Sequence, residues 1–401
     1  MDEIDVPPFF LCPISLELMK DPVTVSTGIT YDRENIEKWL FSGKNNTCPA
    51  TKQALPADSD LTPNHTLRRL IQSWCTMNAS HGVERIPTPK PPVSKTQIAK
   101  LLNDANSPHL KIKCLQKLRS IASESAANKR CMEAAGAVEF LASIVSSTTV
   151  VEEASSGDAL SILYSLQLSE AALKILIGKN GEFIKSLIRI MQGGSYESRA
   201  YSILLLKSMM EVADPMQMIR LETEFFVEIV QVLHDQISQQ ATSAALKLLI
   251  QLSPWGRNRI KAVNGGAVSV LIELLLDSSE RRACEMMLMV VDILCGCAEG
   301  RAELLEHAAG LAIVSKKIMR VSHVATDKAV RILLSVSKFL ATPAVIQEML
   351  QLGVVAKLCL LLQTDSENKA KDKAREILKL HARAWRGSSC IPKNFLSSYP
   401  S

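Results

Sequence analysis

The sequence predicts a mainly α-helical protein, in which a small α+β domain precedes a right-handed helical solenoid. Glycine-centred turns recur at steps of 42 to 45 residues after residue 96, and only helical patterns lie between them. Aromatic residues make up 4% of the chain, whereas Leu, Ala, Ile and Met are abundant. Four prolines within residues 81–95 separate the repeats from the N-terminal segment. The 401 residues exceed one ordinary core, so at least two structural units are expected.

The N-terminal segment, residues 6–80, opens with signals for a hairpin. Residues 23–25 and 29–31 are β-prone, and Gly28 between them tolerates a positive φ. Asp32 is the expected N-cap of a helix that carries Ile36, Trp39 and Leu40 and ends near Gly43. A second helix is expected after Pro63 and Asn64, with Leu67, Leu70, Ile71 and Trp74 on one face.

Two half-complete cysteine pairs characterise this segment. Cys12-Pro-Ile-Ser15 and Cys48-Pro-Ala-Thr51 each read like a C-x-x-C zinc knuckle whose second cysteine has become a hydroxyl residue. A cross-braced zinc fold needs eight ligands, and the first eighty residues supply only Cys12, Cys48, Cys75 and His65. We therefore expect no metal and no cofactor. Polar side chains should stabilise the small core instead, with candidates Ser15, Asp21, Asp32, Arg33 and Thr51.

The repeats occupy residues 96–385 after a semi-rigid, proline-rich linker at 81–95. Their turns stand at Gly136, Gly181, Gly266, Gly310 and Gly353, with a degenerate copy near residues 224–226. Five or six repeats are expected, stacked so that neighbours share a continuous core and present a long concave surface. A terminal helix is expected from the pattern of Ala374, Ile377, Leu378, His381 and Trp385, with His381 as a surface or cap residue, and residues 386–401 read as a loose tail.

Composition restricts the classes of function. Ten scattered cysteines and the absence of a signal peptide predict a reducing, intracellular environment. The most apolar long stretch, residues 283–298, is interrupted by Glu285 and Asp292, so no membrane span is expected. The net charge of +5 is too small and too diffuse to argue for nucleic-acid binding.

The motifs of residues 6–78 resemble the U-box, the zinc-free relative of the RING domain in E3 ubiquitin ligases. The resemblance implies a ligase that docks a ubiquitin-charged E2 enzyme and forms no covalent intermediate, so no catalytic residue is assigned. It also implies a shallow apolar docking surface, to which loop residues and the central helix contribute. Carried over to this sequence, that surface comprises Ile14, Leu16, Met19, Trp39 and Pro49. The implied structural residues are Cys12, Ser15, Asp21, Asp32, Arg33, Cys48, Thr51 and Asn64.

Two residues need separate consideration. Lys52 stands where related U-boxes often carry arginine as a linchpin cation between E2 and ubiquitin. Lysine lacks the planar fork of arginine, which argues against strong linchpin behaviour. Cys12 is a candidate nucleophile by residue type, but no His or Asn is arranged to activate it, and a buried structural thiol is favoured.

The repeats resemble armadillo repeats. The order of U-box, linker and repeats resembles a compact subgroup of plant ligases that is associated with immune and abiotic-stress signalling. This resemblance implies substrate recruitment by the armadillo groove, proteasomal degradation of substrates, and a cytoplasmic location, with nuclear or membrane-peripheral pools as alternatives. Two other functions stay open: a non-catalytic scaffold or import adaptor, and a U-box that binds E2 without activity. The repeats contain only Trp255 and Trp385, which argues against an import adaptor's tryptophan ladder.

Regulation is suggested by two Thr-Pro pairs. Members of the family often self-associate through the segment that corresponds to residues 61–64, so a homo-oligomer is a candidate state. Thr62 and Thr88 both precede proline, and a phosphate at either adds about −2 charge. Phosphorylation is a hypothesis here, and ordinary turn threonines are an equally good interpretation.

Overall fold

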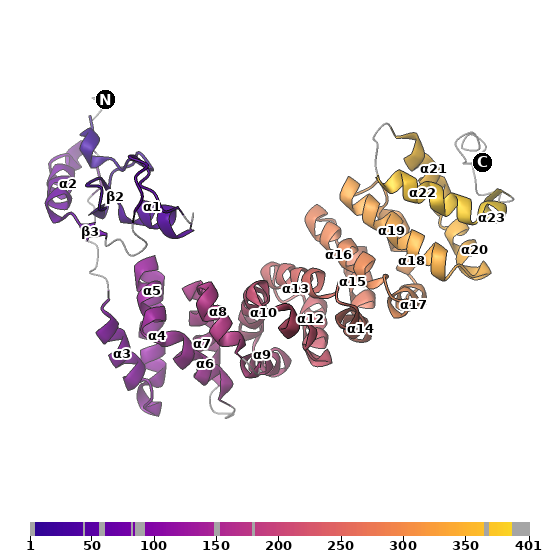
Figure 1. The fold of residues 1–401 in the computed structure, drawn as a ribbon, viewed down its shortest axis with the longest axis horizontal. Helices are drawn as coiled ribbons and strands as arrows, with labels where there is room; N and C mark the ends of the chain where they lie inside the picture. Colours follow the sequence, from indigo (N-terminus) through magenta and orange to yellow (C-terminus); the bar gives the residue numbers. More distant parts are fainter. Residues whose placement is uncertain are drawn as a thin grey trace. The chain divides into compact units, whose positions relative to one another are not determined.

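The computed structural model describes residues 5–42, 45–55, 61–81, 83–84, 93–147, 153–178, 181–364 and 369–386. The chain forms two compact units, one of residues 1–94 together with 126–128, and one of residues 95–125 and 129–401. The predicted fold class is confirmed: a small α+β unit is followed by a stack of helices. Figure 1 shows the order of the elements.

The N-terminal unit contains a three-stranded antiparallel sheet of order β2-β1-β3. The predicted hairpin is present, with Val23 opposite Tyr31 and Gly28 in the turn at φ 81°. The third strand also pairs with the first, which places Thr62 opposite Thr24. The strands are β1 (Pro22–Thr24), β2 (Thr30–Asp32) and β3 (Thr62–Pro63). The helical segments are η1 (Pro8–Phe10), α1 (Arg33–Glu37), the π-helix η2 (Lys38–Ser42), α2 (His65–Met77) and η3 (Ala79–His81).

Three details of these helices differ from expectation. Asp32 is the N-cap residue of α1, but its side chain makes no cap hydrogen bond, because its Oδ1 accepts the backbone N–H of Asp21 at 2.8 Å. The helix around Trp39 changes from α to π geometry after Glu37, and Gly43 lies outside the described residues. Leu70 faces solvent rather than the core, whereas Ile71 is buried.

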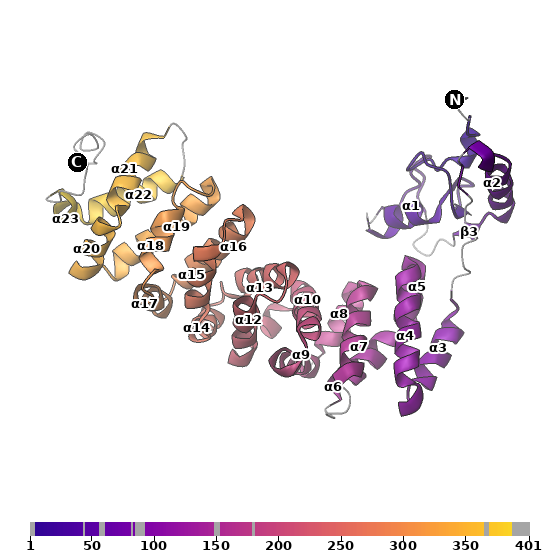
Figure 2. The ribbon, with the colours of Figure 1, turned by 180° about the vertical axis from the view of Figure 1, so that it is seen from behind.

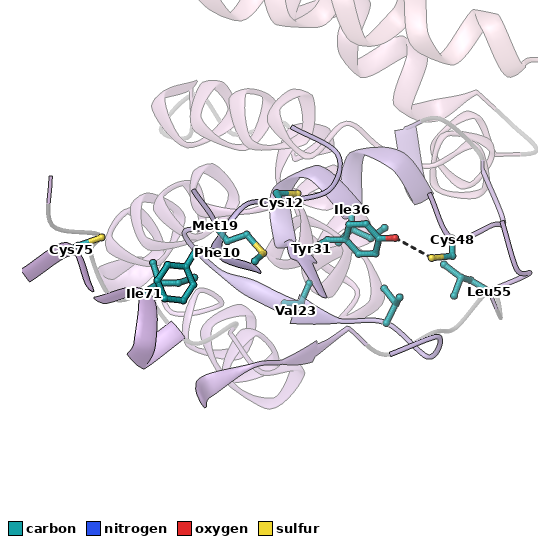
Figure 3. Packing of buried hydrophobic residues seen from close by; sticks show 11 residues of the cluster. Phe10, Cys12, Met19, Val23, Tyr31, Ile36, Cys48, Leu55, Ile71 and Cys75 are labelled. Carbon is teal, nitrogen blue, oxygen red and sulfur yellow. Dashed lines mark hydrogen bonds between the residues drawn. The ribbon is translucent and has the colours of Figure 1, made fainter. Parts of the chain in front are cut away.

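One apolar cluster forms the core of this unit, and it includes all three of its cysteines (Figure 3). Strand and loop residues meet helix α2 in this cluster: Phe10, Cys12, Met19, Val23, Val25, Tyr31, Ile36, Cys48, Leu55, Ile71 and Cys75. Because Cys12 and Cys48 each contribute a buried sulfur, the positions that would hold metal in a zinc knuckle are part of the packed interior.

The C-terminal unit is built from helix triplets, each with a short first helix, a second helix and a longer third helix. Helices α3 (Lys95–Asp104) and α4 (Pro108–Glu124) precede the triplets. The first three triplets are α5 (Ala126–Ala134), α6 (Ala137–Ser146), α7 (Glu153–Leu166); α8 (Glu170–Ile177), α9 (Glu182–Gly193), α10 (Tyr196–Val212); and α11 (Pro215–Ile219), α12 (Thr223–Asp235), α13 (Gln239–Leu252). The next three are α14 (Gly256–Asn264), α15 (Ala267–Asp277), α16 (Arg281–Leu294); α17 (Ala298–Glu306), α18 (Gly310–Lys317), α19 (His323–Phe339); and α20 (Pro343–Gln351), α21 (Val354–Gln363), α22 (Lys369–Leu380), followed by α23 (Ala382–Arg386).

The third helices pack on one another in succession, from α4 through α7, α10, α13, α16 and α19 to α22. Figures 1 and 2 show this succession from opposite sides of the stack. The glycines of the repeated turns are needed for two different reasons. Gly266 adopts a left-handed conformation at φ 80°, and a side chain on Gly310 would overlap the carbonyl oxygen of Leu304. In the degenerate copy, Phe225 and Phe226 are buried.

The end of the unit differs slightly from the single terminal helix that the sequence suggested. The helix is interrupted between α22 and α23. Trp385 is buried, and the Nε2 of His381 lies 2.9 Å from the carbonyl oxygen of Ser337 on the preceding third helix. Among the described residues, no single helix has the length and apolarity to cross a membrane, although α20 and α21 pass that test as a pair bent by 63°.

Candidate functional site

Two loops of the N-terminal unit follow the same backbone path. In the first loop, the N–H of Cys12 donates to the carbonyl of Glu17 and the N–H of Leu16 donates to the carbonyl of Cys12, both at 2.8 Å. In the second, Cys48 and Lys52 form the corresponding bonds at 2.8 and 2.9 Å. Leu16 and Lys52 adopt matching left-handed conformations, at φ 59° and 60°. The two half-complete cysteine pairs are therefore equivalent loops, each closed on its cysteine by the same two backbone hydrogen bonds.

Hydroxyl groups surround the sulfur of Cys48. The Thr27 hydroxyl donates to Sγ at 3.3 Å, and the Tyr31 hydroxyl lies 3.0 Å from it. Because the Tyr31 oxygen already accepts the N–H of Ala50 at 3.1 Å, its own proton is available for the sulfur (Figure 3). Burial raises the pKa of the Cys48 thiol, but hydrogen bonds from Thr27, Thr51 and Tyr31 outweigh it and lower the pKa to about 6. Cys48 is thus a thiolate-like acceptor at neutral pH.

Cys12 occupies the equivalent position in the first loop. Its Sγ accepts the backbone N–H of Asp32 at 3.3 Å and the Nδ2 of Asn35 at 3.6 Å. Burial raises the pKa of Cys12, but the hydrogen bonds, from the Asp32 backbone above all, leave it below its usual value. Cys12 is fully buried, which fits a structural thiol better than a nucleophile. No group of three or more His, Cys, Asp or Glu residues suited to metal occurs in the part of the chain that the structure describes.

Asp21 connects the sheet to both helices. The Arg33 Nε donates to its Oδ2 at 2.7 Å, and the Arg68 guanidinium donates to its Oδ1. The side chains of Asp21 and Arg33 are 18% and 19% exposed, so water screens this cluster only partly. Asn64 caps α2 by accepting the N–H of Leu67 at 3.0 Å. Burial raises the pKa of Asp32, whose carboxylate is engaged by the Asp21 backbone.

The predicted polar residues therefore lie in three separate clusters, around Cys48, Cys12 and Asp21. Ser15 accepts a hydrogen bond from the Asn35 Nδ2 at 3.0 Å in the Cys12 cluster, and Thr51 belongs to the Cys48 cluster. Sequence reasoning missed four members: Thr27, Tyr31, Asn35 and Arg68. The polar residues of the hairpin could have suggested Thr27, but nothing local pairs Arg68 with Asp21.

The candidate docking residues are located on the two loops and on the helix between them. Leu16 is 74% exposed, and Ile14, Trp39 and Pro49 are half-buried. The Trp39 indole donates to the carbonyl of Thr47 at 2.8 Å, which ties η2 to the second loop. The Lys52 ammonium lies 5.6 Å from the centre of the Trp39 ring. An apolar side chain held outward beside a fixed aromatic ring is the arrangement that a partner's apolar residues can cover.

Met19 requires a correction. The sequence assigned it to the docking surface, but it is 2% exposed and belongs to the core cluster. Its backbone N–H donates to the carbonyl of Phe10 at 2.9 Å, which directs this part of the loop inward. Of the two candidate phosphorylation sites, Thr62 is exposed on β3, and Thr88 lies outside the described residues.

Comparisons with known proteins agree with this geometry. Residues 6–80 match the family model of the U-box domain, and residues 97–401 match that of the plant U-box protein ARM repeat region. The E3 ubiquitin-protein ligase PUB23 of Arabidopsis thaliana is 61% identical over 406 residues, covering 100% of this chain and 98% of the relative. PUB22 of the same plant, also an E3 ubiquitin-protein ligase, is 58% identical over 432 residues, covering 99% of both chains.

Among solved structures, a computationally designed armadillo repeat protein for modular peptide recognition aligns at a TM-score of 0.37 and 17% identity, over 71% of this chain and 98% of its own. The U-box implies an interaction with an E2 enzyme, and armadillo repeats suggest a protein-binding surface. The loops of the N-terminal unit, the helix triplets, both family models and two full-length relatives lead to one conclusion: the chain belongs to the plant U-box/armadillo-repeat proteins and is an E3 ubiquitin ligase of the U-box class.

Proposed function

We propose that the U-box docks a ubiquitin-charged E2 enzyme through Ile14, Leu16, Trp39 and Pro49, while the armadillo groove recruits the protein to be modified. The observation that carries the docking surface is Leu16, which is 74% exposed although it belongs to a loop that two backbone hydrogen bonds, Cys12 to Glu17 and Leu16 to Cys12, close on itself. An exposed leucine on a rigid loop loses little conformational entropy when a partner covers it.

The chemistry follows from positioning rather than from covalent catalysis. The two U-box cysteines nearest the docking surface, Cys12 and Cys48, are fully buried, so neither accepts ubiquitin as a thioester. The U-box instead holds the E2 so that its thioester carbon meets a substrate lysine. Restricting orientation in this way converts an encounter in solution into a reaction within one complex.

We propose that the Lys52 ammonium, which lies 5.6 Å from the centre of the Trp39 ring, contacts E2 and ubiquitin together. A lysine donates as a point charge and lacks the bidentate geometry of arginine. We therefore propose that Lys52 contributes weakly to the closed arrangement of the E2–ubiquitin conjugate.

The cellular role rests on the resemblance to the compact plant subgroup. We propose that modified substrates are degraded by the proteasome, in immune or abiotic-stress signalling, in the cytoplasm, with nuclear or membrane-peripheral pools as alternatives. The two relatives above, whose names state an E3 ubiquitin-protein ligase, support the reaction.

An assay of ubiquitin-chain formation tests the proposal. The full chain is combined with E1, a panel of E2 enzymes, ubiquitin and ATP, and compared with Ile14→Ala and Trp39→Ala. High-mass ladders from the wild type that are lost in both variants would support it, provided that hydrogen exchange shows a folded U-box. No ladder from folded wild type with any E2 enzyme would favour the scaffold or the inactive-ligase alternative.

We propose further that the U-box self-associates and that phosphorylation at Thr88 or at Thr62 alters this association or auto-ubiquitination. Thr62 is exposed next to Pro63, and its backbone pairs with Thr24 in the sheet, so a phosphate would add charge to a surface-exposed strand. Light scattering and ladder formation by a Thr62→Glu, Thr88→Glu variant test this. Unchanged oligomer size and activity would count against it.

A further inference from the structure

The third helices carry a column of equivalent positions along the exposed face of the stack. Leu204, Lys247, Met289 and Arg331 each stand nine residues after the N-cap residue of their helix, in α10, α13, α16 and α19. None is buried, whereas the residues on either side of Lys247 belong to the core. Because these four helices pack in succession, the column runs along the stack as apolar, basic, apolar, basic.

The two cations of this column differ in their partners, because Arg331 is paired with Asp292 whereas Lys247 has no ion pair among the described residues. Of the five carboxylates that α10, α13, α16 and α19 carry, four are ion-paired, Glu211 with Lys207 among them, and Glu197 accepts a hydrogen bond from the Tyr201 hydroxyl. Asp292 takes Lys328 at 3.3 Å and Arg331 at 3.0 Å, Asp327 pairs with Lys373, and Glu285 pairs with Arg281. Lys247 is exposed, and no ion pair or hydrogen bond engages its ammonium among the described residues. Lys247 is therefore a cation of this face that no carboxylate of the described residues neutralises.

Arg331 leaves part of its guanidinium free. Among the described residues, the one ion pair of Arg331 is between its Nε and Asp292, and 48% of its side chain is exposed. The terminal nitrogens are therefore free to take a carboxylate from a partner, while Asp292 fixes the orientation of the guanidinium. Burial raises the pKa of Asp292, although the neighbouring Arg331 and Lys328 oppose that effect.

The spacing of the column limits the shape of the partner. Axes of packed helices lie about 8–10 Å apart, and an extended chain rises about 3.3 Å per residue, so one helix corresponds to roughly two or three residues of a peptide. Lys247 and Arg331 are two helices apart. Two acidic residues about five or six positions apart in an extended segment would reach both cations. An apolar residue midway between them would contact Met289, and one beyond the acidic residue on Lys247 would contact Leu204.

We propose that the face of α10, α13, α16 and α19 binds an extended acidic segment of a protein, with carboxylates on Lys247 and Arg331 and apolar side chains on Met289 and Leu204. This proposal rests on the recruitment of substrates by the armadillo groove and names their chemical class. Interleaved apolar positions distinguish this surface from the continuous run of cations that a nucleic-acid backbone would need. Opposite charge in the partner is expected to raise the rate of association and to weaken binding in salt.

Fluorescence anisotropy with synthetic peptides tests the proposal on the full chain. The probes are about twelve residues long, carry two Asp or Glu residues five or six positions apart, and have Leu or Ile between them, in both chain directions; matched probes carry Lys instead. Saturable binding of an acidic probe is expected, with affinity reduced about tenfold or more in Lys247→Glu and in the double variant Lys247→Glu, Arg331→Glu. The matched control is Lys316→Glu, an exposed cation on α18, which should leave the affinity unchanged.

Lys247→Glu alone is an informative variant, because Lys247 is exposed and its replacement breaks no ion pair or hydrogen bond within the described part of the chain. Equal affinity of this variant and the wild type, binding of the basic probes in place of the acidic ones, or no saturable binding of any acidic probe would each overturn the proposal. Formation of ubiquitin ladders in the absence of substrate reports separately on the ligase. A wild type that binds acidic probes but forms no ladder would refute the proposed reaction and leave the acidic ligand in place.

Discussion

Replacing Asp21 with asparagine tests whether ion pairs stabilise this U-box, as bound zinc stabilises a RING domain. The substitution keeps the shape of the side chain and removes the charge that Arg33 and Arg68 share. The expected loss is specific to the N-terminal unit, because both arginines belong to that unit. The solenoid should keep its stability.

The magnitude follows from exposure and partners. A hydrogen bond to a charged group contributes about 1.5–3 kcal/mol net, and Asp21 makes one to each arginine at 18% exposure. Partial screening and the retained amide acceptor reduce this total, so Asp21→Asn should cost about 2–4 kcal/mol of the free energy of unfolding. In protection against hydrogen exchange, that loss corresponds to roughly 30- to 900-fold for amides that exchange by unfolding of the unit.

Hydrogen exchange with mass spectrometry on the full chain measures this for peptides from each unit separately. The matched control is Glu34→Gln, which removes an ion pair with Lys38 of the same 2.7 Å length at 74% and 67% exposure. That pair should contribute less than about 0.5 kcal/mol. Equal losses of protection for Asp21→Asn and Glu34→Gln would refute the reasoning.

Three further predictions follow. The pKa of Cys48 is lowered to about 6, so its thiolate stabilises the U-box above the thiol's unfolded pKa, and that contribution is lost as pH falls through 6. Cys48→Ala should remove the resulting pH dependence of the free energy of unfolding between about pH 8.5 and 6. Urea unfolding followed by the ¹⁹F signal of fluorotryptophan at Trp39 measures this free energy at each pH. Gly310→Ala should destabilise the solenoid by about 1–3 kcal/mol, because the new Cβ meets a carbonyl oxygen of the preceding helix. Gly256→Ala, with nothing near its Cβ, should leave the free energy of unfolding unchanged. Urea unfolding followed by circular dichroism measures both variants. Lys52→Arg should speed E2-dependent ladder formation several-fold through the bidentate fork, and an unchanged rate would exclude a linchpin role for this position.

The elements that the sequence predicted correctly are those with local or periodic signals. The hairpin depends on six residues around Gly28, and the solenoid depends on a repeat that can be measured along the chain. The helix that Asn64 caps belongs to the same class, since its cap acts three residues away. Each of these structures is specified within a short window or by repetition.

The parts that the sequence did not predict depend on contacts between distant residues. Arg68 meets Asp21 across 47 positions, and Tyr31 meets Cys48 across 17. Leu16 and Met19 are three residues apart in one loop, yet one points outward and the other into the core. That difference arises because Leu16 has a positive φ and the Met19 backbone bonds to Phe10, and neither feature is visible in residue type.

The most direct test of the central claim is single-turnover discharge of a purified E2–ubiquitin thioester onto free lysine, which isolates positioning from substrate recruitment. Leu16→Ala should slow discharge by about tenfold or more, because the exposed anchor of the docking surface is removed without disturbing the core. Leu70→Ala, which truncates an exposed leucine on α2, should discharge at the wild-type rate. Equal rates for Leu16→Ala and the wild type would contradict the account and move the docking surface elsewhere on the U-box.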